Sequence, residues 1–472
     1  MDSKELALYS MNENLIALSP RSDTFQNSFF YIKSILELAL PNTITGVCWR
    51  LQVLITFYFV GLLNDIKLLD GVALGYTWAT VCSFSVIFGF TSALDTFVSQ
   101  HFGNQDYKNC GLIFNRSFVM VSIILIPCIL LQLSARFVFE SIGIDYDVAV
   151  YGGNFNIALL PTIMVYIPHI IIEKFLLSQR ISKAQMIIQF INTVLHPLYC
   201  SLFIFWLDLG MVGAAAVRAL SEIVYTASLI LYMKLSKCCE KTLIAPTMDV
   251  FKDWKPFLSI AFPSLFMTCL EWWGFEAMSL MSGKLGVIDL AANVICFNYS
   301  AFLFMVGLGV SLATGTLVGN SIGENNIKKA KIYTKLGVYM TTFIILILGI
   351  IIIVFKSFFA RVFTGDEEVA SLLETLLYLV VVDVIFDTNQ ITLAKIIIAL
   401  GKQSYATWIN LIAYWFLMLP IGIITGFWLN WRVHGVWFGI IIASLTACIG
   451  NGYILCKTDW NNLRKVTLEK QA

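Results

Sequence analysis

The sequence predicts an all-α membrane protein of twelve transmembrane helices in two pseudo-symmetric six-helix lobes. Three observations predict this fold: apolar types make up 58% of the 472 residues and charged types only 13%, the mean hydropathy is +0.80, and the two halves of the chain resemble each other. In soluble domains about 25% of residues are charged, so this chain has too little charge for a water-soluble protein of its size. A net charge of +1 also argues against a nucleic-acid partner, which requires a basic face.

A helix needs about 20 mostly apolar residues to cross a bilayer. Twelve stretches meet this requirement, near 33–60, 72–96, 113–134, 153–177, 185–207, 212–233, 255–281, 290–314, 334–355, 370–399, 405–428 and 434–456. The mixed polar residues before the first stretch do not form a signal peptide, so we expect the first span to direct insertion.

The loop charges predict the orientation of the chain. Lys and Arg concentrate in the loops that share a side with both termini, so we expect both termini in the cytosol. The predicted organisation is an N-terminal tail at 1–30, an N-lobe at 31–233, an inter-lobe loop at 234–254, a C-lobe at 255–456 and a C-terminal tail at 457–472.

An internal repeat relates the two lobes. GFTSALDTFVSQHFGNQDYKN from Gly89 aligns at a constant shift with GVSLATGTLVGNSIGENNIKK from Gly309. The stretch LALPN around Pro41 mirrors IAFPS around Pro263, and Ile191–Asn192 mirrors Ile409–Asn410. Such common spacing indicates duplicated units. Six spans in each unit predict a parallel repeat, a design in which transporters place a binding site between two lobes that rock around it.

Ionisable residues within predicted spans are costly and mark functional sites. Glu271 and Glu276 lie in the seventh span, and Asp383 and Asp387 lie one helical turn apart in the tenth. Burial disfavours a charged carboxylate, so such groups take up protons readily. They could also cage a metal cation or attract an organic cation. The structural alternative, in which they pair with Lys395 or backbone and stabilise helix packing, stays open.

The remaining polar residues favour structural roles. Asp95 closes the second span, where polar groups usually satisfy the helix end, and Ser99–Gly103 and Gly319–Gly323 are expected to form tight turns and close helix contacts. The four histidines show no metal-ligand spacing, so we expect no metal and no cofactor. The sequence has no Walker A motif and no hydrolase or dinucleotide-binding motif, so we expect a protein that is not an enzyme and is not driven by ATP.

Four motifs together resemble the eukaryotic branch of the multidrug and toxic compound extrusion (MATE) family, and the resemblance covers about 30–460. LEWWGFEAMSLMSG in the seventh span resembles the EWW-x-[FY]-E signature of that branch, and ALDTFVSQHFG resembles its ALDT-x-x-x-Q-x-[FY]-G motif. GVSLATGTLVGNSIGENN resembles G-x-S-x-A-x-x-x-x-V-x-N-x-[LI]-G, and FDTNQ in the tenth span resembles F-[DE]-x-x-Q.

The resemblance implies a V-shaped pair of lobes and antiport, in which proton or sodium entry drives export of organic cations or other xenobiotic-like compounds. By position, Glu271, Glu276 and Asp387 match the acidic cation site of the second lobe, with Asp383 as a further candidate. Asn298 stands where animal members often carry a glutamate, which removes one cavity charge. The run Thr314–Leu317 replaces the usual A-S-V-R, which removes an arginine.

Two further groups of residues complete the predicted site. The cavity-lining candidates are Trp272, Trp273, Asn298, Gln390, Asn192 and Asn410. The rings of the two tryptophans could hold an organic cation. The residues expected to shape the fold are Pro41, Asp95, Gln100, Gly103, Pro263, Asn320 and Gly323.

We therefore predict a monomeric exporter of small organic, mainly cationic, substrates in the plasma membrane or a vacuolar or lysosomal membrane. We favour protons over sodium as the coupling ion because paired buried acids titrate readily. The main alternative is a lipid or oligosaccharide flippase of the same superfamily, which the acidic rather than basic intramembrane charge disfavours. A channel, a non-transporting scaffold or a membrane-embedded enzyme fits the repeat and its buried acids less well.

Overall fold

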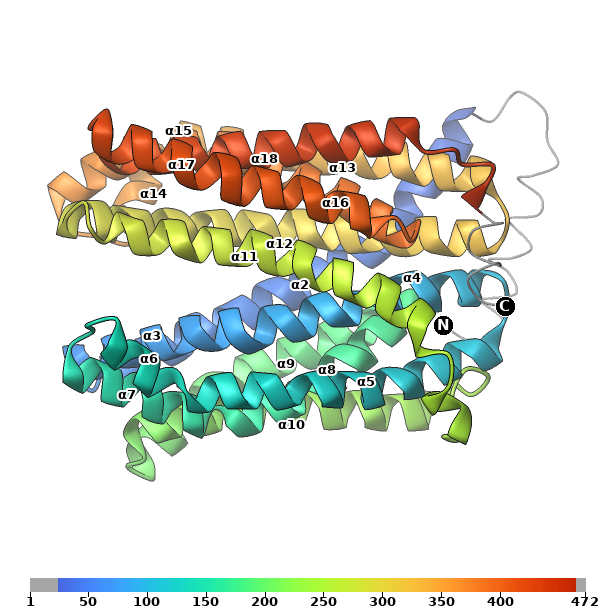
Figure 1. Ribbon diagram of the computed structural model, residues 1–472, viewed down its shortest axis with the longest axis horizontal. Coiled ribbons are helices and arrows are strands. Elements are labelled where there is room, and N and C mark those ends of the chain that lie inside the picture. Colours follow the sequence, from blue (N-terminus) through green and yellow to red (C-terminus); the bar gives the residue numbers. More distant parts are fainter. Residues whose placement is uncertain (1–23, 464–472) are drawn as a thin grey trace.

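The computed structural model describes residues 24–463, and these residues form helices and connecting turns without a β-strand. The predicted tails lie partly outside the described residues, at 1–23 and 464–472. Figure 1 shows the two halves of the chain as two packed groups of helices, the first blue to green and the second yellow to red. This confirms the predicted all-helical, two-lobe fold.

The helices of the first lobe are α2 (Thr24–Gly61), α3 (Ile66–Ala79), η1 (Thr80–Phe84), α4 (Ser85–Gly103), α5 (Tyr107–Leu133), α6 (Ala135–Ser141), α7 (Tyr146–Ala158), α8 (Leu160–Ser178), α9 (Lys183–Cys200), η2 (Ser201–Trp206) and α10 (Gly210–Ser236). After the short helix η3 (Met248–Phe251), those of the second lobe are α11 (Trp254–Ser282), α12 (Val287–Gly323), α13 (Ile327–Val354), α14 (Lys356–Val362), α15 (Glu367–Ala399), α16 (Gln403–Asn410), η4 (Leu411–Met418), α17 (Leu419–Ile423), η5 (Ile424–Trp428) and α18 (Arg432–Lys457).

Eleven helical stretches among the described residues are long and apolar enough to cross a membrane. The helix that completes the predicted twelve is α11, whose 29 residues suffice for a span and whose charged residues include Glu271 and Glu276. The fourth predicted span, at 153–177, is divided between α7 and α8, which meet at Leu159. Pro161 lies at the start of α8, where a missing amide hydrogen is tolerated.

The first long helix of each lobe crosses from one lobe to the other (Figure 1). The first part of α2 packs into a core that otherwise consists of C-lobe helices, where Ile35 and Leu38 join Val310 and Tyr333. The first part of α11 packs in the same way into the N-lobe core, through Phe257. The two lobes are therefore joined through exchanged helix ends as well as by surface contact.

Both crossing helices carry the predicted internal prolines, Pro41 in α2 and Pro263 in α11. Each proline carbonyl accepts a side-chain hydrogen bond, from Thr45 at 2.9 Å and from Thr407 of α16 at 2.8 Å. Proline interrupts the ladder of helical hydrogen bonds and allows a bend. The repeat thus places equivalent prolines in the two helices that pass between the lobes.

Two of the four π-helical segments among the described residues also follow the repeat. The fifth predicted span ends in η2 and the eleventh ends in η5, and the closing residues are Trp206 and Trp428. Many large apolar side chains are exposed on the outer helices, among them Ile126, Leu130 and Phe190. Exposed apolar surface of this extent is typical of a face that contacts lipid.

Candidate functional site

Two carboxylates lie close together inside the C-lobe, one from α11 and one from α15. Glu271 and Asp387 are 4% and 3% exposed. Asn410 Nδ2 donates to Glu271 Oε2 at 3.4 Å, and Gln390 Nε2 donates to Asp387 Oδ1 at 3.4 Å. Asp387, Gln390 and Lys395 all lie near enough to act on the Glu271 carboxylate. The structure therefore brings together two of the predicted acids and two of the predicted amides, and Asp383, one helical turn before Asp387, lies within electrostatic reach of this pair.

Oxygen atoms without hydrogen-bond partners surround this acid pair. Within the described part of the chain, Gln390 Oε1, Asn410 Oδ1 and the hydroxyl of Tyr414 are buried and unpaired. The two amide oxygens can only accept hydrogen bonds. A buried acceptor left unpaired costs about 1–3 kcal/mol, so these atoms fit an additional donor or a bound cation. A protonated carboxyl group is one such donor.

The other two predicted acids have different surroundings. Asp383 is fully buried and accepts a hydrogen bond from Ser444 of α18 at 2.7 Å, while its second oxygen has no partner among the described residues. Glu276 is partly exposed and lies within electrostatic reach of Arg50 from α2. Arg50 donates to Asn298 Oδ1 at 3.2 Å, which places an N-lobe cation beside two predicted C-lobe site residues.

The two tryptophans of the seventh span contact the N-lobe. Trp272 stacks on Phe88 of α4, with ring centroids 5.7 Å apart. Trp273 Nε1 donates to the Val81 carbonyl at 2.9 Å, within the π-helical segment η1. The widened turn of a π-helix offers such carbonyls to outside partners. The EWW motif thus places an acid in the C-lobe and two aromatic rings on the N-lobe.

Asp95 links the two lobes through charge. Its carboxylate Oδ2 is 2.9 Å from Lys174 Nζ of α8 and 3.6 Å from Lys395 Nζ of α15. Both ammonium groups also lie over the Phe88 ring, at 4.6 Å and 5.1 Å from its centroid. The prediction that Asp95 closes its helix is wrong, because α4 continues to Gly103; Asp95 lies inside the helix and holds one cation from each lobe.

Lys395 and Lys174 are candidate site residues that the sequence interpretation did not single out. Both are almost fully buried. The structural alternative paired Lys395 with the C-lobe acids, whereas its ion pair is with Asp95 of the N-lobe. The available signal was their depth within predicted spans, where an unpaired lysine is strongly disfavoured.

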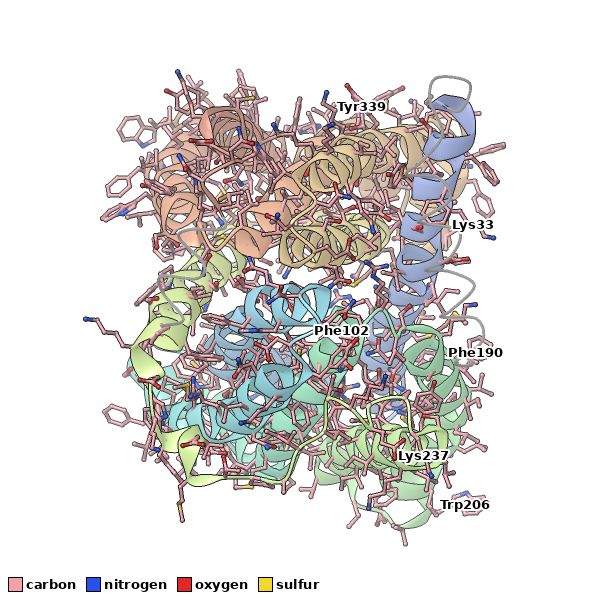
Figure 2. The ribbon with its side chains drawn as sticks, turned by 90° about the vertical axis from the view of Figure 1, so that its right-hand side faces the viewer. Lys33, Phe102, Phe190, Trp206, Lys237 and Tyr339 are labelled. Carbon is pink, nitrogen blue, oxygen red and sulfur yellow. The ribbon has the colours of Figure 1, made fainter. Side chains whose placement is uncertain are left out.

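The repeated motifs of α4 and α12 pack against each other at the end where both helices stop. A Cβ atom on Gly103 would lie 2.0 Å from the Asn320 carbonyl oxygen, and one on Gly323 would lie 2.0 Å from that of Gln100. Gln100 Nε2 donates to the Ala399 carbonyl at 2.6 Å. Figure 2 views the molecule from this end, with Phe102 near the contact between the lobes and Lys237 on the N-lobe.

Asn320 and Arg180 extend this contact. Asn320 Nδ2 donates to the carbonyls of Ser99 and Ser178, at 3.0 Å each, while its Oδ1 accepts from Arg180 Nε at 2.7 Å. Arg180 also pairs with Glu324 at 3.1 Å. Asn192, the N-lobe counterpart of Asn410, is buried and donates to the Ser221 carbonyl within its own lobe at 3.0 Å.

Comparison with known proteins identifies the family. The MatE family model matches twice, over residues 41–202 and 263–424, one match in each lobe. The chain belongs to the multidrug and toxic compound extrusion (MATE) family. The paired matches confirm the predicted resemblance, and they follow the internal repeat.

Individual MATE proteins align over most of the chain. Multidrug and toxin extrusion protein 1 of Oryctolagus cuniculus is 26% identical over 91% of this chain and 75% of its own length. The protein of the same name from Rattus norvegicus is 30% identical over 88% and 74%. The crystal structure of the eukaryotic MATE transporter AtDTX14 superposes with a TM-score of 0.88 at 26% identity and covers 94% of this chain and 99% of that one.

Proposed function

We propose that this MATE protein exports small organic cations by exchange with protons. The observation that carries the proposal is the buried pair of Glu271 and Asp387, which lies beside acceptor oxygens that lack donors. Two neighbouring carboxylates in a nonpolar interior cannot both be charged without a large cost. Either a proton or an organic cation relieves that cost, so the two ligands compete for one negative site.

The surroundings of the acid pair support a cationic, partly aromatic substrate. Trp272 and Phe88 present stacked rings at the surface between the lobes, and aromatic faces attract organic cations. The positions of Lys395 and Asp95 support coupling between the site and lobe movement. Lys395 acts electrostatically on Glu271 and at the same time pairs across the lobes with Asp95, so a change of charge at the site alters the inter-lobe contact.

The orientation proposed from the loop charges places both chain termini in the cytosol. The tight packing around Gly103 and Gly323 then closes the cytosolic end, and exchange with the opposite side requires the lobes to part and close again. We further propose that a monomer suffices and that the protein resides in the plasma membrane or a vacuolar or lysosomal membrane.

The decisive experiment uses purified protein in liposomes with an imposed proton gradient and no sodium. Accumulation of a fluorescent organic cation is expected in the wild type and is expected to vanish in Glu271→Gln and Asp387→Asn. Glu140→Gln serves as a matched control, because Glu140 lies outside the site at an exposed helix and pairs with Arg136. Full gradient-driven accumulation in Glu271→Gln would contradict the proposal.

Two other outcomes would assign a different function. Accumulation that needs a sodium gradient instead of a proton gradient would make sodium the coupling ion at the same acids. No accumulation under either gradient would favour anionic or lipid-like substrates, and a flippase assay with fluorescent lipids would then be the next measurement.

A further inference from the structure

A second cluster of charged side chains lies inside the N-lobe, away from the C-lobe acid pair. Helix α8 contributes His169 and Glu173, and α10 contributes Arg218 and Glu222, each pair one helical turn apart. His169, Arg218 and Glu222 are at most 5% exposed. A buried ionic cluster is costly, and transport through the C-lobe site gives it no role.

Both ring nitrogens of His169 face carboxylates. Nδ1 contacts Glu222 Oε2, and Nε2 lies 2.8 Å from Glu173 Oε2. A neutral imidazole has one donor nitrogen and one acceptor nitrogen, and an ionised carboxylate can only accept. A neutral histidine between two ionised carboxylates has only one N–H to donate. A second proton is therefore needed for both contacts to be hydrogen bonds. The structure corresponds to the proton-loaded form of the cluster.

The rest of the cluster balances that extra proton. Arg218 donates to Glu222 Oε1 at 3.0 Å and to Gln52 Oε1 of α2 at 3.2 Å, and it lies 5.6 Å from the centroid of the Trp49 ring. With His169 charged, two cations face two carboxylates. Loss of the proton would leave a buried net negative charge and would turn a nitrogen lone pair toward a carboxylate, so the contact between α8 and α10 would have to change.

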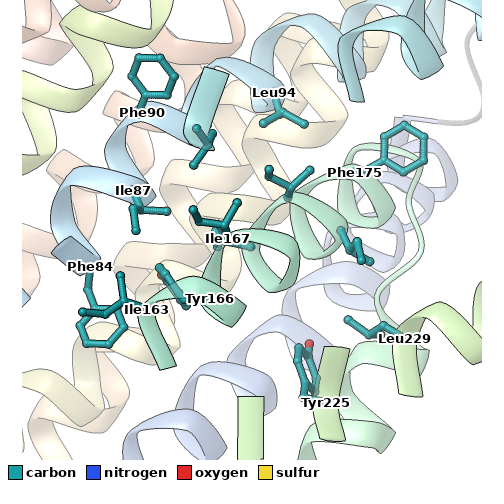
Figure 3. Packing of buried hydrophobic residues seen from close by; sticks show 14 of the residues in the cluster. Phe84, Ile87, Phe90, Leu94, Ile163, Tyr166, Ile167, Phe175, Tyr225 and Leu229 are labelled. Atoms are coloured by element: carbon teal, nitrogen blue, oxygen red, sulfur yellow. The ribbon is translucent and has the colours of Figure 1, made fainter. Parts of the chain in front are cut away.

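Among residues 24–463, Glu173 and Glu222 are the charged groups that act on His169. Tyr225 of α10 and Tyr166 of α8 pack on its ring, with centroids 4.6 Å and 5.5 Å away, and both appear in the packed N-lobe interior of Figure 3. Tyr76 of α3 lies within reach of Arg218 and Glu222. From α9, His196 lies near the same arginine, and from α4, Asp95 is already paired with Lys174.

We propose that His169, Glu173 and Glu222 form a second proton-exchange site, located in the N-lobe. Glu173 has a side chain that is 22% exposed, so it is the least buried of the three and the one through which a proton would enter or leave. The link to transport rests on the proposed antiport function. A proton bound here changes the packing of α8 and α10 independently of the C-lobe pair, so each lobe carries its own proton.

The chain contains a matched control for this site. His196 is buried in the same lobe, but its ring nitrogens face the hydroxyls of Thr56 at 2.9 Å and Ser221 at 2.8 Å. A hydroxyl can donate as well as accept, so a neutral imidazole satisfies both contacts. His196 should therefore remain neutral under conditions in which His169 changes its charge.

The test measures the ring protonation of ¹⁵N-histidine-labelled wild-type protein in lipid nanodiscs by NMR, from about pH 5 to about pH 11, because two neighbouring carboxylates stabilise the protonated ring beyond the range in which histidine ordinarily titrates. The four histidines are assigned by single substitutions such as His196→Gln. His169 is expected to pass from doubly to singly protonated within this range, and tetraethylammonium is expected to shift the midpoint. A His169 that stays doubly protonated, or stays neutral, throughout the range would overturn the proposal.

A second variant and an independent assay separate this proposal from the function. Glu222→Gln is expected to move the His169 transition to lower pH, because the partner loses its charge, and an unchanged transition would contradict the site. The labelled wild type needs no transport activity. A titrating His169 in a protein without proton-driven transport would refute the antiport function alone, whereas proton-driven transport with an invariant His169 would refute the N-lobe site alone.

Discussion

At the scale of single residues, the contact between the lobes depends on a few buried charges. Asp95 holds Lys174 from its own lobe and Lys395 from the other, with Phe88 beneath both ammonium groups. Because Asp95 has two partners, loss of one does not leave it unpaired. Removal of Lys395 therefore tests the coupling between the lobes more directly than it tests folding.

We expect Lys395→Gln to lower the transport rate by about tenfold or more, which corresponds to about 1.4 kcal/mol in the barrier. The substitution removes the ion pair across the lobes and the positive charge beside Glu271. The measurement is initial uptake of an organic cation into liposomes. Lys402→Gln is the control, since the Lys402 ammonium group donates to Thr458 Oγ1 at 3.4 Å and forms no ion pair within the described part of the chain. Equal rates in the two variants would remove Lys395 from the mechanism.

The turn after α4 supplies a pH-dependent contribution to stability. Asp106 caps α5, and although burial opposes its ionisation, hydrogen bonds from Asn109 and the neighbouring His101 hold the pKa of Asp106 below its ordinary value. Such a group stabilises the fold above the unfolded pKa of about 3.9 and loses its effect as the pH falls through the lower, folded pKa.

We therefore expect Asp106→Ala to destabilise the protein by about 1 kcal/mol at neutral pH, the usual value of an N-terminal helix cap. The difference from wild type should disappear as the pH falls below about 4, where the unfolded side chain is protonated. Thermal unfolding in detergent at several pH values measures this difference. A constant difference at every pH would mean that the cap acts through its uncharged hydrogen bonds.

At the scale of elements, the helix ends that repeat in sequence are also the ones that touch. Gly103 at the end of α4 and Gly323 at the end of α12 each meet the backbone of the other helix. Small residues allow two helices to approach closely. The repeat was visible in the sequence, but the mutual contact of the two copies appears only in the structure.

Gly103→Ala is expected to destabilise this contact by about 1–3 kcal/mol, the range for inserting a methyl group into packed structure. Its Cβ would overlap the Asn320 carbonyl, whose position depends on the whole of α12. Gly61→Ala is the matched control, because the nearest atom to its Cβ is 3.9 Å away. The melting temperature reports the change, and a Gly103→Ala protein as stable as wild type would show that the helices separate without cost.

At the scale of the whole molecule, transport by two lobes requires them to move apart where they now meet. Arg180 of the N-lobe pairs with Glu324 of the C-lobe at 3.1 Å, on the exposed side of this contact. Within the N-lobe, Lys67 of α3 pairs with Asp147 of α7 at 2.5 Å, across two helices that stay together. The two pairs differ chiefly in whether they bridge the lobes.

A reducible bismaleimide between Arg180→Cys and Glu324→Cys is therefore expected to stop transport, and reduction is expected to restore it. The same reagent between Lys67→Cys and Asp147→Cys should leave transport within about twofold of the untreated protein, because rigid-body motion of the lobes does not change distances within one lobe. The background carries Cys238→Ala, Cys448→Ala and Cys456→Ala, which removes the thiols that are not buried. Transport that continues across a complete inter-lobe cross-link would exclude movement at this contact.

Much of the fold could be predicted from the sequence because it follows from local properties. Bilayer thickness makes span length and hydropathy informative, and the repeat around Gly89 and Gly309 indicates two equivalent lobes. Glu271 and Asp387 were found because a carboxylate inside an apolar span is rare and visible at once. Both lie in one buried group, as their shared lobe suggested.

The tertiary structure alone decided which charges meet. Lys395 pairs with Asp95, far away in the sequence, and His169 lies between Glu173 of its own helix and Glu222 of another. Helical spacing shows which residues share a face of one helix, but it contains no information on which helices cross. Asp95 meets Lys395 where α4 packs against α15, and His169 meets Glu222 where α8 packs against α10, and these helix contacts result from packing over the whole chain.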